Sequence, residues 1–117
     1  MKADMRIKSD VYSITLNNTK AAKDFAAMMP ITLTLEDYAG SEKISDLPSR
    51  LDRSDSPAGT DAKKGDIAYY APWGNIALFY GDARFAHGLV ALGKIDEGSK
   101  MLSLYGNRFE ATFEISE

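Results

Sequence analysis

The residue types that best suggest binding chemistry lie between positions 63 and 82, in the stretch KKGDIAYYAPWGNIALFYGD. This stretch holds the only tryptophan of the chain, Trp73, within a Pro-Trp-Gly-Asn turn. Pro72 suits the first central position of a β-turn, and the Asn75 side chain can either hold the turn or contact a ligand. Trp73 could form an aromatic platform beside a cleft. The alternative is a tryptophan lid that closes one end of a barrel.

A second group of polar side chains gathers near the end of a predicted strand. It consists of Glu36, Tyr38, Glu42 and Lys43. Glu36 and Glu42 could form a carboxylate pair, with Lys43 as an electrophile that polarises a carbonyl. The favoured alternative is a solvated strand face, because charged side chains are common on strand edges and contribute little there.

Other patterns of catalytic or metal-binding residues are absent from the sequence. His87 is the only histidine and has no ligand-spaced partner, and the chain has no cysteine. No nucleophile-elbow sequence accompanies the serines, and Gly59 and Gly65 are too isolated for a phosphate-binding loop. Asp52 and its neighbours lack the spacing of a calcium loop. We therefore expect neither a metal nor a cofactor.

Length and charge restrict the classes of partner. With 117 residues the chain should form a single domain, over 1–117. A net charge of −3 gives no electrostatic reason to expect nucleic acid as a partner, and no apolar run approaches the roughly 20 residues that span a bilayer. The N-terminal MKADMRIKSD is too polar for a signal peptide. We expect a cytoplasmic protein, or an exported one if a signal peptide has been removed.

Alternating apolar and polar residues predict many short strands and two helices. This pattern is typical of a closed barrel or a sandwich, and helices could cover the open ends of a barrel. The predicted strands cover residues 6–9, 11–16, 31–36, 42–44, 67–70, 76–80, 88–95 and 109–115, and the predicted helices cover 20–29 and 97–104.

Several local signals refine these elements. The residues Asn17-Asn18-Thr19 can cap the first helix, Pro30 ends it, and Asp96 can cap the second helix. Tyr69 and Tyr70 must face opposite sides of a regular strand, so one should be buried and the other could meet a ligand. Gly93 can mark a bulge or a close approach of the backbone. Residues 45–64 show no periodicity and predict a long surface loop, and 82–87 a simple connection.

The order of elements and several segments resemble the cyclophilin fold. Residues 19–28, TKAAKDFAAM, are similar to the first cyclophilin helix with its Thr-Ala-x-Asn-Phe pattern, and residues 37–44, DYAGSEKI, to the Tyr-x-Gly-Ser-x-Phe-His-Arg-Ile segment. Residues 65–80 resemble a signature of small bacterial cyclophilin-like proteins, Gly-Asp-Ile-x-Tyr-Tyr-x-Pro-Trp-Gly-Asn-x-Ala-x-Phe-Tyr. The resemblance implies a mainly β, closed barrel with one helix in the N-terminal half and one short helix near the C-terminus.

The resemblance also implies where a site would lie. Cyclophilins that isomerise X–Pro bonds use an arginine of the Phe-His-Arg segment, and here Lys43 takes that place, with Glu42 at the histidine. Lysine lacks the planar fork of donors that arginine presents. Phe79 stands near the position of the cyclophilin Gln-Phe-Phe pocket, whereas the later tryptophan and histidine of that pocket have no clear counterpart.

We therefore predict a binding domain without efficient catalysis, which takes a peptide or a small molecule in a cleft beside residues 72–75. The alternatives are a peptidyl-prolyl isomerase with Lys43 as the catalytic electrophile, and a purely structural or assembly role. The sequence does not predict the oligomeric state. The predicted ligand-binding residues are Tyr38, Glu42, Tyr70, Trp73, Asn75 and Phe79, and Lys43 should complete the cleft.

Overall fold

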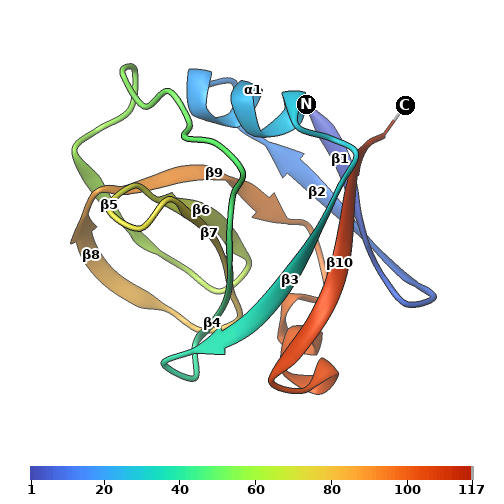
Figure 1. The fold of residues 1–117 in the computed structure, drawn as a ribbon. Coiled ribbons are helices and arrows are strands. Elements are labelled where there is room, and N and C mark those ends of the chain that lie inside the picture. Colours follow the sequence, from blue (N-terminus) through green and yellow to red (C-terminus); the bar gives the residue numbers. More distant parts are fainter. Residues whose placement is uncertain (117) are drawn as a thin grey trace.

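The computed structural model describes residues 1–116 (Figure 1). Its central feature is a barrel of antiparallel strands whose side chains alternate between the inside and the outside. Eight of its strands form a closed barrel in the order β1-β10-β3-β4-β7-β6-β9-β2. The mainly β, closed-barrel prediction is therefore confirmed. The barrel strands are β1 (Lys2–Ile7), β2 (Asp10–Leu16), β3 (Ile31–Tyr38), β4 (Glu42–Asp46), β6 (Asp66–Tyr70), β7 (Asn75–Phe79), β9 (Leu89–Ile95) and β10 (Arg108–Ile115).

The two helices lie at opposite ends of the barrel (Figure 1). The helix α1 (Lys20–Ala27) sends Phe25 into the core, where its ring meets the ring of Phe113 edge-on at 5.6 Å. At the other end the 3₁₀ helix η1 (Ser99–Tyr105) buries Leu102 in the same core. Within the described part of the chain, neither helix has the length and apolarity that crossing a membrane requires.

Several local predictions are confirmed. The Thr19 hydroxyl accepts a hydrogen bond from the Ala22 backbone N–H at 3.2 Å, so it caps α1 as expected. Tyr69 is buried and Tyr70 faces outward. At Gly93 the backbones of β9 and β2 approach so closely that an added Cβ would lie 2.2 Å from the Thr15 carbonyl oxygen.

Several element ends differ from the prediction by a few residues, and two differences concern the barrel wall. The first strand begins at Lys2 rather than Arg6, because Ala3 and Met5 already alternate into the core. Asp96 does not cap the second helix, whose N-cap position is held by Gly98. The Asp96 carboxylate instead accepts hydrogen bonds from the side chains of Thr15 and Lys2 across the barrel wall.

The prediction of a long loop over residues 45–64 is wrong near both of its ends, where strands are found. The prediction of a simple connection over residues 82–87 is also wrong. β4 continues to Asp46, and β5 (Gly59–Ala62) pairs with β8 (Ala83–His87) in a separate two-stranded sheet. These two strands are short and lack alternation, so only their pairing across the chain defines them. Between β4 and β5, Leu51 is buried in the core and its segment is tied to α1 by a hydrogen bond from the Asp52 N–H to Asp24.

The contact between Phe25 and Phe113 gives a test of how far α1 stabilises the barrel. Phe25→Ala should lower the free energy of unfolding by about 3–5 kcal/mol, because it removes a fully buried ring and leaves a cavity. Urea denaturation followed by circular dichroism measures the difference. Phe85→Ala is the control, since Phe85 is 57% exposed and should cost far less. Equal losses in the two variants would contradict this account of the core.

Candidate functional site

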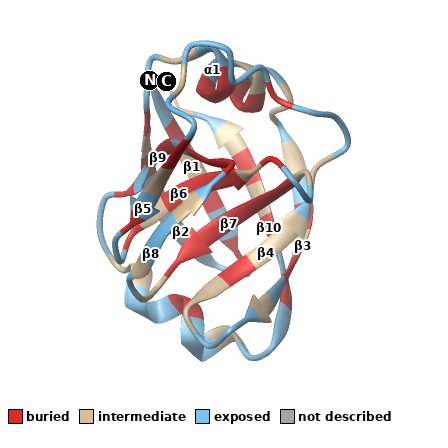
Figure 2. Cartoon of the chain, turned by 90° about the vertical axis from the view of Figure 1, so that its left-hand side faces the viewer, coloured by how far each residue is buried: buried red, intermediate tan, exposed pale blue. Residues whose placement is uncertain are grey.

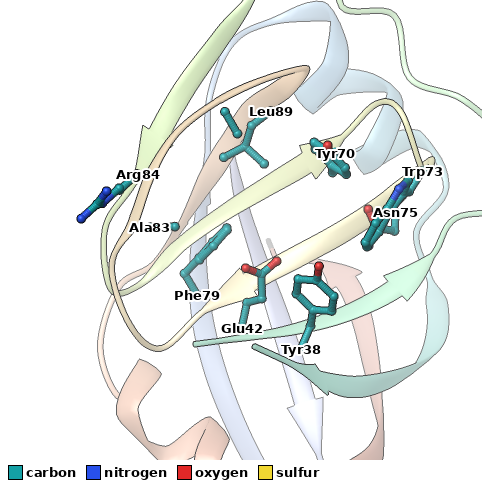
Figure 3. A pocket seen from close by; sticks show the side chains of 10 residues that line it. Tyr38, Glu42, Tyr70, Trp73, Asn75, Phe79, Ala83, Arg84 and Leu89 are labelled. Atoms are coloured by element: carbon teal, nitrogen blue, oxygen red, sulfur yellow. The ribbon is translucent and has the colours of Figure 1, made fainter. Parts of the chain in front are cut away.

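A pocket of about 210 Å³ opens on the outer face of the barrel (Figure 3). Its wall is formed by the barrel strands β3, β4, β6, β7 and β9 and by β8, which lies over them. The structure brings all six predicted ligand-binding residues together around this pocket. The lining residues are Tyr38, Glu42, Tyr70, Trp73, Asn75, Phe79, Ala83, Arg84, Ala86 and Leu89.

Strand register explains why these side chains meet. Across β3, β4 and β7, Tyr38 lies opposite Glu42 and Glu42 lies opposite Phe79. Asn75 lies four residues before Phe79 on β7, on the same face of the strand, and is opposite Tyr70 of β6. Because side chains alternate between the two faces of a strand, both rows point outward together. The pocket therefore follows from the pairing of four strands rather than from a single motif.

Three aromatic rings form one corner of the pocket, which we call the aromatic corner: Tyr38, Tyr70 and Trp73. The Trp73 ring meets the Tyr38 ring at 5.4 Å and 88°, and the Tyr70 ring at 5.3 Å and 82°. The turn that carries Trp73 is closed by a hydrogen bond of 2.9 Å from the Gly74 N–H to the Tyr70 carbonyl, with Gly74 at φ 70°.

The structure decides between the two interpretations of Trp73. Its side chain is 55% exposed at the pocket, and the barrel ends are covered by α1 and η1 instead. The lid interpretation is therefore wrong, and the indole lies where a platform beside a cleft would be.

Asn75 is the most unusual residue of the pocket. The residue is only 2% exposed, and its side-chain oxygen Oδ1 finds no hydrogen-bond partner among residues 1–116. A buried polar atom without a partner costs about 1–3 kcal/mol. Holding the turn, which was one interpretation of this side chain, leaves Oδ1 unexplained.

Glu42 brings a carboxyl group to the pocket, and its oxygens point into the space between Phe79 and Tyr38 (Figure 3). Burial raises the pKa of the Glu42 carboxyl, and the neighbouring negative charge of Asp37 raises it further. Both effects disfavour the ionised form, so a positive charge placed beside Glu42 would relieve them.

Lys43 does not complete the cleft, which corrects the prediction. Glu42 faces the pocket, so the next residue of the strand must face the barrel interior. The Lys43 side chain is 3% exposed, and its Nζ donates to the Gly106 carbonyl at 2.8 Å and lies 3.2 Å from Asp37 Oδ1. The amine is thus engaged on the side of the strand away from the pocket.

Asp37 and Tyr80 complete a partly buried polar cluster around this amine, which was not predicted from the sequence. The Tyr80 hydroxyl donates to Asp37 Oδ1. That hydrogen bond, followed by the contact with Lys43, lowers the pKa of Asp37 despite its partial burial. Burial and the bonded carboxylate raise the pKa of Tyr80 to about 12. Asp37 lies just beyond the strand predicted for residues 31–36, so nothing in the pattern links it to Tyr80.

The remaining candidate groups lie outside the pocket or point away from it. Glu36 lies on the solvated face of β3, where its carboxylate is 3.3 Å from Arg108, so no pair with Glu42 forms at the pocket. Arg84 lines the rim but directs its guanidinium outward (Figure 3). No three acidic or histidine side chains within residues 1–116 are grouped closely enough to hold a metal.

Four lining residues were not predicted as part of the site: Ala83, Arg84 and Ala86 of β8, and Leu89 of β9. The three residues of β8 were missed because residues 82–87 were interpreted as a connection. The side chains of Ala83, Ala86 and Leu89 are small or apolar and give no chemical signal of their own. Only the pairing of β8 with β5 brings the β8 residues over the barrel.

Comparisons with known proteins agree with this fold. The family model described as the Cyclophilin-like family matches residues 5–114. Among solved structures, the solution structure of a hypothetical protein from Archaeoglobus fulgidus is similar over 99% of this chain and 95% of that chain. Its TM-score is 0.69 at 19% sequence identity, so this similarity concerns the fold alone. None of the curated proteins matches this chain.

The buried cluster around Lys43 gives a stability test. Lys43→Met should lower the free energy of unfolding by about 2–4 kcal/mol, because it removes a buried charged donor and leaves Asp37 without its cation. Thermal and urea denaturation at pH 7 measure the change. Lys63→Met is the matched control, since the Lys63 side chain is 70% exposed and its loss should change little.

The same variant should show a defined dependence on pH. A lowered carboxyl pKa stabilises the folded state above the ordinary value of 3.8, and this contribution is lost as the pH falls through the lowered pKa. Part of the lowering is absent in Lys43→Met, so the gap between wild type and variant should narrow in acid. A gap that widens below pH 4 would contradict the assigned contact.

Proposed function

Because the chain belongs to the cyclophilin-like family, we propose that it is a binding domain that holds a peptide side chain or a small molecule in the outer pocket, without efficient catalysis. The single observation that carries the proposal is that Asn75, a residue of the pocket wall, has a buried side-chain oxygen without a hydrogen-bond partner among residues 1–116. A bound donor would satisfy this atom, and nothing within residues 1–116 does so.

The size and lining of the pocket support a small ligand group. The pocket volume is about 210 Å³. It lies below the range of about 300–1,000 Å³ that holds drug-sized ligands. Phe79 and Leu89 supply apolar wall, whereas Asn75 and Glu42 supply polar groups. This mixture suits one side chain of a peptide, or a small molecule of similar size.

The alternative, prolyl isomerisation, lacks its electrophile in the pocket. Lys43 takes the place of the cyclophilin arginine. Its amine donates a hydrogen bond to the Gly106 carbonyl and contacts Asp37, on the side of the strand that faces away from the pocket. Arg84 points outward and would have to turn to reach a ligand (Figure 3). The preorganised positive charge that favours amide rotation is therefore not in position.

Ligand binding can be tested by NMR titration of ¹⁵N-labelled protein with a library of small aromatic, amine and acid fragments and short peptides. We expect binders that shift the Asn75 side-chain amide and the Trp73 indole signals. Asn75→Ala should weaken such binding about tenfold, the equivalent of one lost hydrogen bond to a buried acceptor. Asn18→Ala is the matched control, because Asn18 is exposed and lies outside the pocket.

A second measurement on the same samples separates binding from catalysis. Exchange spectroscopy on X–Pro peptides should show no rate above the uncatalysed one. Isomerisation well above background that disappears in Trp73→Ala would replace the binding proposal with the isomerase. If no fragment or peptide shifts the Asn75 and Trp73 signals, the pocket is not a binding site.

A further inference from the structure

We propose that the group held in the outer pocket is an organic ammonium that carries at least one N–H, with its charge against the aromatic corner and Glu42 and its N–H donated to Asn75. The inference rests on the proposed function, because it names the ligand class of the same pocket. It is argued from three independent features of the wall: its charge, its aromatic rings and its unfilled acceptor.

The charge distribution around the pocket favours a cation. Among residues 1–116, Glu42 is the lining residue that brings an ionisable acid into the space, and the outward-pointing Arg84 does not neutralise it (Figure 3). Asp46 lies opposite Asn75 in the register of β4 and β7, so a second carboxylate belongs to the same outer face. The nearest lysine of that strand, Lys43, is turned to the barrel interior and paired with Asp37.

The aromatic corner offers exposed ring surface that a cation can approach. Trp73 lies nearly perpendicular to both Tyr38 and Tyr70, at 88° and 82°, so the three rings form walls that meet rather than a closed stack. Trp73 and Tyr38 are 55% and 44% exposed, so much of their surface is open to a ligand. A cation within about 6 Å of the centre of an aromatic face is attracted by the ring, most strongly by tryptophan.

The Asn75 side-chain oxygen, which accepts no hydrogen bond from residues 1–116, restricts the kind of cation that would fit. Asn75 lines the pocket and its Oδ1 is buried, so a ligand N–H would reach this atom by turning the amide toward the pocket. An ammonium with an N–H can donate to it, whereas a fully alkylated ammonium cannot. The structure therefore points to a primary, secondary or tertiary ammonium rather than a quaternary one.

The rest of the wall fits the carbon frame to which such an ammonium is attached. Phe79, Leu89, Ala83 and Ala86 make the side of the pocket beneath β8 apolar. An alkyl chain or a single aromatic ring would bury its surface there while its ammonium lies by Glu42. Both a lysine side chain of a peptide and a free small amine have this chemistry.

The test uses three probes of nearly the same shape and different charge: benzylammonium, benzyl alcohol and benzoate. Each is titrated into the ¹⁵N-labelled protein at pH 7, and the affinity is read from the Trp73 indole and Asn75 amide shifts. Benzylammonium should bind about tenfold more tightly than benzyl alcohol, and benzoate should bind weakest. Dimethyl- and trimethyl-substituted benzylammonium then test the N–H: the trimethyl form should lose affinity relative to the dimethyl form.

Two variants connect the charge preference to the pocket. Glu42→Gln keeps the shape of the side chain and should reduce the preference for benzylammonium over benzyl alcohol several-fold, while benzyl alcohol still binds. Glu97→Gln makes the same change of charge at an exposed position outside the pocket and should leave the preference unchanged. Thermal unfolding of both variants shows whether the fold is kept.

The outcomes separate this inference from the proposed function. Equal binding of benzyl alcohol and benzylammonium, or tighter binding of benzoate, overturns the ammonium proposal and leaves a pocket that binds apolar groups. Failure of all three probes also overturns it, and the wider fragment screen then decides the proposed function alone. Comparison of N-acetyl-lysine N-methylamide with its norleucine analogue identifies the source: preference for the lysine form points to a peptide, and its absence points to a free amine.

Discussion

Coverage of β7 on both faces is the constraint on which the rest of the structure depends. All five residues of this strand are buried, as its continuous red colour in Figure 2 shows. Ile76 and Leu78 point into the barrel, while Ala77 and Phe79 point outward and need a second cover. Ala62 of β5 and Ala83 and Ala86 of β8 belong to the same outer apolar cluster and supply part of that cover. The pocket lies on this outer face and is lined both by β8 and by the turn that carries Trp73.

The same alternation divides the polar chemistry of β4 between two environments. Glu42 lies on the outer face and meets the pocket, whereas Lys43 lies inside and is held by Asp37 and the Gly106 carbonyl. A shift of register by one residue would exchange them, placing a lysine in the pocket and a carboxylate in the barrel. Lys43 is held by Asp37 of β3 and by the carbonyl that follows η1, so its contacts oppose such a shift.

Sequence reasoning predicted the barrel and both helices because β2, β3, β10 and α1 carry clear periodicity and caps. It also identified six pocket residues, since the aromatic turn and the segment around Tyr38 carry distinctive side chains. It could not predict β5 and β8, whose few residues show no alternation and which exist only as partners of each other. Lys43 was misplaced because a residue type shows charge, whereas its side of the strand depends on a register that the sequence alone does not specify.

The proposal that the pocket binds a ligand depends most on Asn75. Its neighbours on the outer face of β7, Ala77 and Phe79, are apolar and fully covered, so an apolar residue at position 75 would continue the pattern without a buried unpartnered atom. The chain instead has an amide there, at a cost to stability of about 1–3 kcal/mol. Residues that break an otherwise consistent pattern concentrate at functional sites. This amide shares the pocket with the aromatic corner and the Glu42 carboxylate. A group that donates a hydrogen bond to its oxygen must therefore be small and must tolerate the nearby negative charge of Glu42.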